Sequence, residues 1–160
     1  MSILTMENIS KSFDSLEVLK DISLSVKEGE VVSIIGPSGS GKSTLLRCAT
    51  LLEKIDTGSI RYMDQYAVKT NDAGRAVYAK PKELRKVKSY FGLVFQQFNL
   101  FPHHTVLKNV MEAPLLVQKR PKYEVLEEAM EILRKMGLED KANAYPWQLS
   151  GGQQQRVGIA

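Results

Sequence analysis

Apolar and polar residues alternate along two short segments near the start of the chain. Residues 3–9 and residues 22–26 both follow this two-residue period, which is typical of strands with one buried face. Residues 27–30, with the sequence Lys-Glu-Gly-Glu, form a polar turn after the second segment. The pattern therefore predicts an antiparallel β layer at the beginning of the chain.

Two further segments are apolar without alternation. Residues 31–35 and 91–95 are rich in β-branched and aromatic side chains, as expected for strands of a parallel sheet that are buried on both faces. A turn followed by another strand is predicted over residues 56–62, and residues 64–80 fit either a variable loop or a short hairpin. Together these segments predict an α/β fold with a parallel core beside the antiparallel layer.

Helical spacing of apolar residues separates these strands and continues after them. It predicts helices over residues 45–52, from Pro81 to about Tyr90, from Val106 past a break or kink at Pro114, and over residues 122–136. Thr105 is a suitable N-cap for the third helix, and Gly137 is expected to end the fourth. In the fourth helix we expect one stripe to face the core and the acidic residues to face water. The stripe comprises Val125, Leu126, Ala129, Ile132, Leu133 and Met136, and the acidic residues are Glu127, Glu128 and Glu131.

A glycine-rich loop stands between the first continuous apolar segment and the first helix. It satisfies the pattern G-x-x-x-x-G-K-[ST], which in a strand–loop–helix setting binds the phosphates of a nucleotide. Glycine permits the close approach and the positive φ angles that let backbone N–H groups surround a phosphate. The alternative is a Gly/Ser-rich surface turn, which the flanking segments disfavour. The loop consists of Gly36, Pro37, Ser38, Gly39, Ser40, Gly41, Lys42, Ser43 and Thr44.

Three residues of this loop carry distinct expected roles. Lys42 supplies a positive charge for the β- and γ-phosphates, and the Ser43 hydroxyl is suited to ligating Mg²⁺. Thr44 adds a hydroxyl near the α-phosphate. The helix that begins here also directs unpaired N–H groups and its positive dipole end at the same anion. The sequence thus predicts a nucleoside triphosphate site at this helix start.

The sequence allows two interpretations of Phe13 and of Gln96. Phe13 either packs into the antiparallel layer or lies exposed and offers its ring to an adenine. Gln96, directly after the second continuous apolar segment, either reaches a metal or an attacking water, or is an ordinary loop amide, which spacing alone favours. His103 and His104 have no acidic or cysteine partner at ligand spacing, so we expect them on the loop surface.

A second helix start with anion-binding character lies near residue 150. Ser150, Gly151 and Gly152 provide a hydroxyl and unobstructed N–H groups before a helical pattern. One nucleotide does not easily require two such loops from one chain. A second copy of the protein that presents this loop across an interface would explain the pair.

Composition and charge exclude several classes of protein. Of the 160 residues, 43% are hydrophobic and 25% charged, which fits one globular domain. No apolar run approaches the roughly 18 residues of a membrane span, and no secretory signal pattern is found at the N-terminus, so we expect a cytoplasmic location.

The single cysteine, Cys48, is expected in the core. The net charge of +4 is mild, and the basic stretch 80–88 reads as a solvated helix face, so no nucleic-acid partner is predicted.

The motifs together resemble those of a known family. Leu149-Ser150-Gly151-Gly152-Gln153 is similar to the signature sequence of ABC transporter ATP-binding domains, and it occurs here with the phosphate loop and with Gln96 in the position of the family's Q-loop glutamine. Residues 94–103, and Tyr145-Pro146 ahead of the signature, resemble the polar amino-acid importers in particular.

This resemblance implies a set of roles, cofactors and partners. ATP and Mg²⁺ are the expected cofactors, with Phe13 stacked on adenine and with Ser43 and Gln96 on the metal. Ser150, Gly151, Gly152 and Gln153 would close on the ATP of a second subunit in a head-to-tail dimer. The Gln96 loop would couple to integral-membrane permease subunits on the cytoplasmic face of the membrane, served by an extracytoplasmic solute-binding protein.

The resemblance also implies the fold and its subdivision. It predicts a P-loop NTPase core with the β layer over about residues 1–99, a helical arm over about 100–150, and the signature over 149–160. The family's chain continues into a strand with the Walker B aspartate and the catalytic glutamate, then a switch histidine; no such aspartate–glutamate pair occurs here. We therefore expect the N-terminal portion of an importer ATPase, without its C-terminal core strands, that binds ATP but does not hydrolyse it.

Two alternatives belong to other classes. One is a fragment that binds nucleotide or a permease without hydrolysis, and the other is a soluble ABC ATPase of DNA repair or translation. Phe98, Phe101 and Pro102 in the loop after Gln96 suit a membrane partner's helix, which argues against the second.

Overall fold

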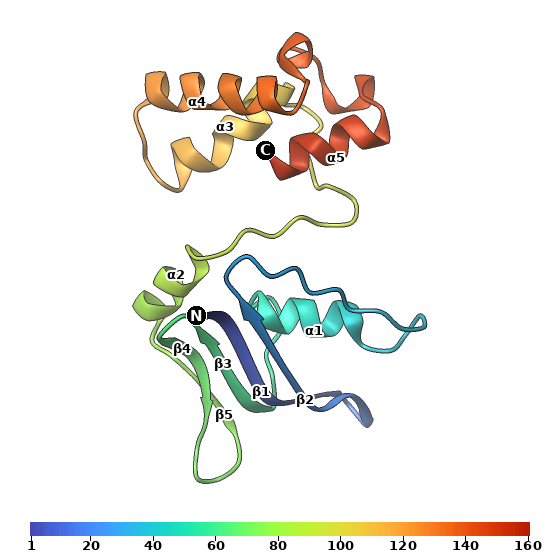
Figure 1. Ribbon diagram of the computed structural model, residues 1–160, viewed down its shortest axis with the longest axis vertical. Helices are drawn as coiled ribbons and strands as arrows, with labels where there is room; N and C mark the ends of the chain where they lie inside the picture. Colours follow the sequence, from blue (N-terminus) through green and yellow to red (C-terminus); the bar gives the residue numbers. More distant parts are fainter. The chain divides into compact units, whose positions relative to one another are not determined.

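The computed structural model describes residues 1–160, which form two compact units (Figure 1). The first unit comprises Met1–Leu93 and the second comprises Val94–Ala160. Each unit is described separately below. No helix in either unit is both long enough and apolar enough to cross a lipid bilayer.

A five-stranded antiparallel sheet forms the frame of the first unit (Figure 1). Its spatial order is β2-β1-β3-β4-β5, and every neighbouring pair is antiparallel. The predicted β layer is therefore confirmed, and residues 64–80 take the hairpin alternative. The strands are β1 (Ser2–Phe13), β2 (Leu16–Lys27), β3 (Thr57–Tyr62), β4 (Gln65–Thr70) and β5 (Ala76–Tyr78).

Two helices accompany this sheet, α1 (Lys42–Ala49) and α2 (Pro81–Lys88). The Tyr62 hydroxyl on β3 donates a hydrogen bond of 2.6 Å to the Ala49 carbonyl at the end of α1. The Tyr78 hydroxyl accepts one of 2.8 Å from the Ile55 N–H. The first of these bonds is buried and the second is partly buried, and both join the segment around α1 to the strands.

The core of the first unit lies between α1 and the sheet. Cys48 on α1 is fully buried there, as predicted, and burial raises the pKa of its thiol to about 11. A thiol with so high a pKa stays protonated and behaves as a small apolar side chain. The other buried members of this core are Met6, Ile9, Leu19, Leu45, Ala49, Ile55, Ile60, Tyr62, Ala67, Val68 and Val87.

Gly58 allows β1 and β3 to approach each other closely. Its φ angle is +107°, and a Cβ at this position would lie 2.6 Å from the carbonyl oxygens of both Glu7 and Asn8. No larger residue fits between these backbones, so the glycine fixes the pairing of the strands where β3 begins.

The two continuous apolar segments do not form the predicted strands. Residues 31–35 and 91–95 make no ladder hydrogen bonds, and Val31 and Ile35 are 92% and 91% exposed. The prediction of a buried strand is wrong for both segments in this structure. A strand is stabilised by bonds to its neighbours, and neither segment has a neighbouring strand among residues 1–160. Phe91 instead stacks on Tyr62, with ring centroids 4.8 Å apart.

The second unit is helical. It contains α3 (Val106–Leu116), α4 (Lys122–Lys135) and α5 (Gly151–Ile159), with short 3₁₀ turns at Glu139–Lys141 and Pro146–Gln148. The Thr105 hydroxyl accepts a hydrogen bond of 3.2 Å from the Lys108 N–H, which confirms the predicted cap. Pro114 lies inside α3, which ends shortly after it, and Gly137 follows the end of α4 with a φ of +66°.

The apolar stripe of α4 is narrower than predicted. Val125, Ala129 and Leu133 are buried, whereas Leu126 is 40% exposed. Leu126 follows Val125 directly, and a turn of 100° per residue carries it away from the core face. The acidic residues Glu127, Glu128 and Glu131 are exposed, as expected.

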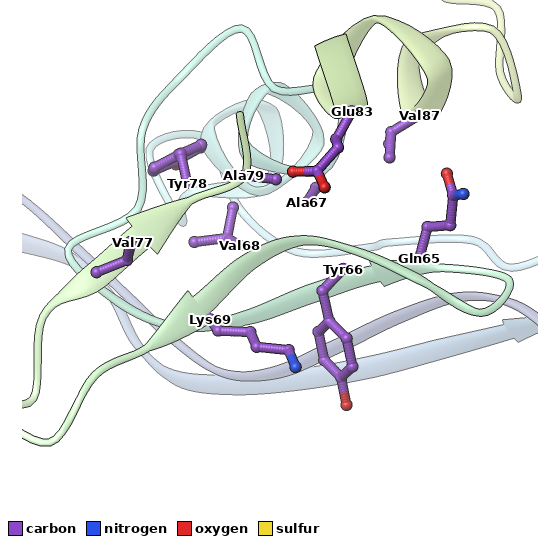
Figure 2. Close-up of a pocket in the computed structure, with 10 residues that line it drawn as sticks. All are labelled: Gln65, Tyr66, Ala67, Val68, Lys69, Val77, Tyr78, Ala79, Glu83 and Val87. Carbon is purple, nitrogen blue, oxygen red and sulfur yellow. The ribbon is translucent and has the colours of Figure 1, made fainter. Parts of the chain in front are cut away.

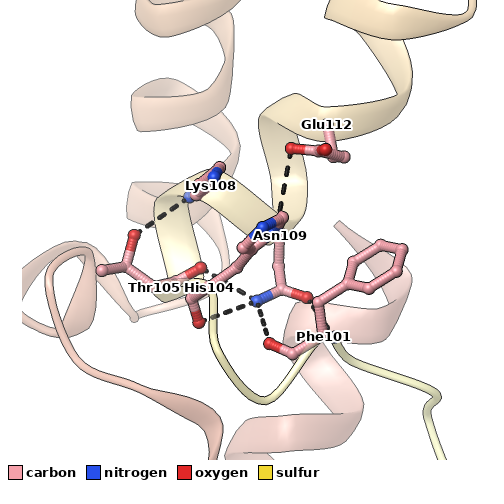
Figure 3. A network of polar contacts seen from close by, with 6 residues as sticks. All are labelled: Phe101, His104, Thr105, Lys108, Asn109 and Glu112. Carbon is pink, nitrogen blue, oxygen red and sulfur yellow. Dashed lines mark hydrogen bonds and ion pairs between the residues drawn. The ribbon is translucent and has the colours of Figure 1, made fainter.

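His104 is buried, contrary to the prediction of a surface position (Figure 3). The Asn109 amide draws the preceding turn onto α3, because it bonds backbone groups of Phe101, His104 and Thr105. This clamp carries the His104 ring inward, where its Nδ1 has no hydrogen bond and lies 3.7 Å from Glu112 Oε2. His103 remains exposed, as predicted.

A cavity of about 420 Å³ lies between β4, β5 and α2 (Figure 2). Val68, Tyr78 and Val87 are among its lining residues, and none comes from the glycine-rich loop. Tyr66 and Lys69 extend to the other side of β4 from Val68, with the Lys69 ammonium 4.0 Å from the centre of the Tyr66 ring. This cavity is therefore separate from the candidate nucleotide site.

Candidate functional site

The glycine-rich loop leads directly into α1, as predicted. Gly41 is the N-cap of the helix with a φ of +86°, and its carbonyl accepts the first helical hydrogen bond from the Leu45 N–H at 2.8 Å. A Cβ on Gly41 would lie 3.0 Å from both the Val18 carbonyl oxygen and Leu19 Cδ2. Only glycine combines this left-handed conformation with so close an approach to β2.

This geometry creates a cavity of about 220 Å³ at the helix start. The N–H groups of Lys42, Ser43 and Thr44 belong to the first turn of α1, where no intrahelical acceptor exists. They stand beside the positive end of the helix dipole, which favours an anion. The residues present therefore fit a phosphate group. The cavity is lined by Val18, Ser38, Gly39, Ser40, Gly41, Lys42, Ser43 and Thr44.

The Lys42 ammonium lies against the same loop. Its Nζ donates to the carbonyls of Gly36 at 2.9 Å and Pro37 at 2.6 Å, and lies 3.3 Å from Ser40 Oγ. Neutral acceptors hold the ammonium here without a carboxylate, so its positive charge is not neutralised by an ion pair. Ser43 is exposed at the cavity, and its hydroxyl is accessible to a cation that accompanies the phosphates.

Phe13 lies at the end of β1 and is 43% exposed. It pairs with Leu16, the first residue of β2, and Val18 of the phosphate cavity follows two residues later. The exposed position agrees with the interpretation in which Phe13 offers its ring to an adenine, and this stacking role remains a prediction. The sequence did not single out Val18, because an apolar residue at the start of a strand carries no distinguishing signal.

Gln96 and the signature residues belong to the second unit, whereas the phosphate loop and Phe13 belong to the first. Gln96 is exposed in a turn, and its side chain makes no hydrogen bond within the chain. Because the Gln96 side chain is exposed, its amide is accessible, and a role on a metal stays a prediction. Phe98 and Asn99 follow with φ angles of +58° and +48°, a conformation that costs non-glycine residues energy.

The signature begins α5, as predicted. Ser150 is the N-cap: its hydroxyl accepts from the Gln153 N–H at 3.3 Å, and Gln153 Oε1 accepts from the Ser150 N–H at 2.9 Å. This reciprocal pair is a capping box. Gly151 and Gly152 have no atom of another segment within 4 Å of an added Cβ, so the space where their side chains would stand is open. The geometry fits a second anion site, with the Ser150 hydroxyl already engaged by its own helix.

A phosphate cavity formed by G-x-x-x-x-G-K-[ST] at the start of a helix defines a P-loop nucleotide-binding protein. Comparison with known families makes the class more specific, because the ABC transporter family model matches residues 19–160. The chain belongs to the ABC transporter family, which binds ATP.

Curated relatives match nearly the whole chain. It is 52% identical over 158 residues to the nopaline permease ATP-binding protein P of Agrobacterium fabrum, covering 98% of this chain and 62% of the relative. It is 49% identical over 158 residues to an L-cystine import ATP-binding protein of Bacillus subtilis, covering 99% of this chain and 62% of the relative. The chain thus spans about 62% of the length of these relatives.

A solved structure supports the fold. The chain resembles the dimeric ATP-binding cassette MJ0796 in a post-hydrolysis state with bound ADP and Pi, with a TM-score of 0.78 and 41% identity over 98% of this chain and 67% of that one. The predicted fold class, a partial P-loop cassette with an antiparallel β layer and a helical arm, is therefore confirmed, although segments 31–35 and 91–95 are not strands.

Proposed function

We propose that the chain is the N-terminal portion of the ATP-binding subunit of an importer for polar amino acids. The phosphate cavity at the start of α1 is the observation that carries the proposal. The related L-cystine import ATP-binding protein and nopaline permease ATP-binding protein support the substrate class. Within this proposal, the permease and an extracytoplasmic solute-binding protein would select the amino acid.

Within this proposal each site residue has a role. The loop Gly36–Thr44 binds the phosphates, and Lys42 neutralises charge on the β- and γ-phosphates. By resemblance to the family, Ser43 and Gln96 would be the residues that hold Mg²⁺, whose charge would stabilise the bound triphosphate. Phe13 stacks on the adenine, and its exposed position supports this role.

A second copy of the subunit completes the site. The open N-terminus of α5, at Ser150, Gly151 and Gly152, would bind the γ-phosphate of ATP held by the other copy. The dimeric state of the related cassette supports this arrangement. The subunit would associate with integral-membrane permease subunits at the cytoplasmic face of the membrane, and the exposed loop around Gln96 would contact them.

Isothermal titration of MgATP tests the proposal. We expect Lys42→Ala to weaken binding by at least tenfold, because a charge-assisted contact to phosphate contributes roughly 1.5–3 kcal/mol. Lys20→Ala is the matched control, since Lys20 is an exposed lysine on β2 paired only with Glu17. Equal affinity of wild type and Lys42→Ala would contradict the proposal.

A phosphate-release assay tests the expectation for hydrolysis. The 160 residues contain no aspartate–glutamate pair after an apolar strand, which is the pair that would activate water in the family the chain resembles. We expect the 160-residue chain to bind ATP without multiple turnover. Turnover that Lys42→Ala abolishes would show that this expectation is wrong.

A further inference from the structure

Lys11 of β1 is a nearly buried cation beside the candidate adenine site. Its side chain is 12% exposed, and its Nζ lies 3.3 Å from Glu53 Oε1 and 3.5 Å from Asp56 Oδ1. A charge so far removed from water needs paired acceptors. Two carboxylates from the segment after α1 meet this need, so the ammonium is fixed in position.

The carboxylates around Lys11 are themselves anchored. Asp56 Oδ2 accepts a hydrogen bond of 2.7 Å from the Ser12 N–H, and the Asp56 N–H donates one of 2.9 Å to the Ser10 carbonyl. The Glu53 N–H donates to the Arg47 carbonyl in the last turn of α1 at 3.0 Å. Lys11 thus stands at the junction between β1 and the C-terminal end of α1.

The same ammonium lies over the ring of Phe13, 4.9 Å from its centroid. A cation within about 6 Å of an aromatic face is attracted by the ring. Lys11 therefore occupies one side of the Phe13 ring, while the ring as a whole remains 43% exposed. A fixed cation on one side restricts the rotamers of an otherwise exposed ring and leaves the other side for a ligand.

The position of Lys11 connects the two ends of the nucleotide site. Phe13 begins the turn into β2, and Val18 of the phosphate cavity lies two residues beyond Leu16, roughly 7 Å along the strand. Glu53 and Asp56, which pair with Lys11, lie in the segment that follows α1, and the phosphate loop leads into the start of that helix. The Lys11 side chain thus contacts both the Phe13 ring and the segment that follows α1.

We propose that Lys11 is a positioning residue for the base of the nucleotide: it holds the Phe13 ring with one side open for stacking and links the ring to the segment that follows α1. The inference rests on the proposed function, because it assumes that Phe13 contacts a nucleobase. Lys11 touches neither the base nor the phosphates in this role.

Calorimetry with two ligands tests the proposal. MgATP contains a base and magnesium tripolyphosphate does not. A variant that disturbs only the stacking of the base on Phe13 therefore weakens MgATP binding and leaves tripolyphosphate binding unchanged. We expect Lys11→Met to weaken MgATP binding about three- to tenfold and to leave tripolyphosphate binding unchanged. Phe13→Ala should show the same selectivity, and Lys11→Met combined with Phe13→Ala should bind MgATP no more weakly than Phe13→Ala. Lys20→Met, an exposed lysine on β2, is the control and should match the wild type.

The outcomes distinguish the role of Lys11 from the contact of Phe13 with the adenine. A Lys11→Met variant that binds MgATP like the wild type, or loses both ligands equally, overturns the role of Lys11 while the nucleotide site stands. A Phe13→Ala variant with unchanged MgATP affinity overturns the adenine contact and the role of Lys11 with it. If circular dichroism shows Lys11→Met to be unfolded, Glu53→Gln removes only the nearer carboxylate. It should then show a smaller loss confined to MgATP, and the absence of that selective loss overturns the proposal.

Discussion

At the scale of single residues, His104 has the most unusual environment in the second unit (Figure 3). Burial lowers the pKa of its imidazole below the usual 6.5, the positive charges of Lys108 and His103 lower it further, and Glu112 opposes them. The unfolded chain therefore binds a proton at a higher pH than the folded chain does. The stabilisation is complete above about pH 6.5 and is lost as the pH falls from that value through the lower folded pKa.

This environment predicts a pH-dependent stability that one substitution removes. We expect the urea midpoint of the wild type to fall between pH 7.5 and pH 5, and that of His104→Gln to fall less, because glutamine does not titrate. His103→Gln is the control, since His103 is exposed in the same loop, and it should retain most of the drop. Equal drops for the wild type and His104→Gln would show that His104 is not the titrating group.

At the scale of elements, the start of α1 depends on Gly41. We expect Gly41→Ala to lower the free energy of unfolding by at least 1–3 kcal/mol, the usual cost of a left-handed non-glycine residue, plus the contact of its Cβ with the Val18 carbonyl. Gly39→Ala is a matched control, because Gly39 also has a positive φ, +81°, but open space around it. Urea denaturation should rank Gly41→Ala as the less stable variant, and the reverse ranking would contradict the close packing against β2.

The start of α5 provides a second test at this scale. Ser150→Ala removes the cap and should lower the free energy of unfolding by about 1 kcal/mol. Ser150→Asn retains a capping side chain and should stay near the wild type in thermal melts. If both variants lose ATP-dependent dimerisation, measured by light scattering, the serine hydroxyl has a ligand role beyond capping. If Ser150→Ala melts like the wild type, the capping box contributes little.

At the scale of the whole molecule, the chain passes from the first unit to the second through a segment without regular structure. Leu93, Val94 and Phe95 are 37%, 47% and 43% exposed and belong to no helix or strand. Proteases cleave extended, accessible chain more readily than helices. We expect chymotrypsin to cut the 160-residue chain first after Leu93 or Phe95, and mass spectrometry should find two fragments that correspond to the two units. First cleavage at Tyr123, which is exposed within α4, would contradict this.

Local sequence determined the elements whose signals are short-range. The alternation in residues 3–9 and 22–26, the proline at the start of α2 and the Thr105 cap each act through neighbouring residues, so the pattern alone predicted them. The same holds for the phosphate loop, since its positive-φ glycines and the helix start depend on local backbone geometry. The family resemblance also followed from local motifs.

Only the tertiary structure decided the rest. Segments 31–35 and 91–95 have the composition of strands, but a strand requires a neighbour to pair with, and none exists within residues 1–160. His104 is buried because Asn109 clamps a turn onto α3, and Lys11 is fixed by carboxylates more than forty residues away in the chain. Composition cannot reveal such contacts, because they depend on which distant segments meet in space.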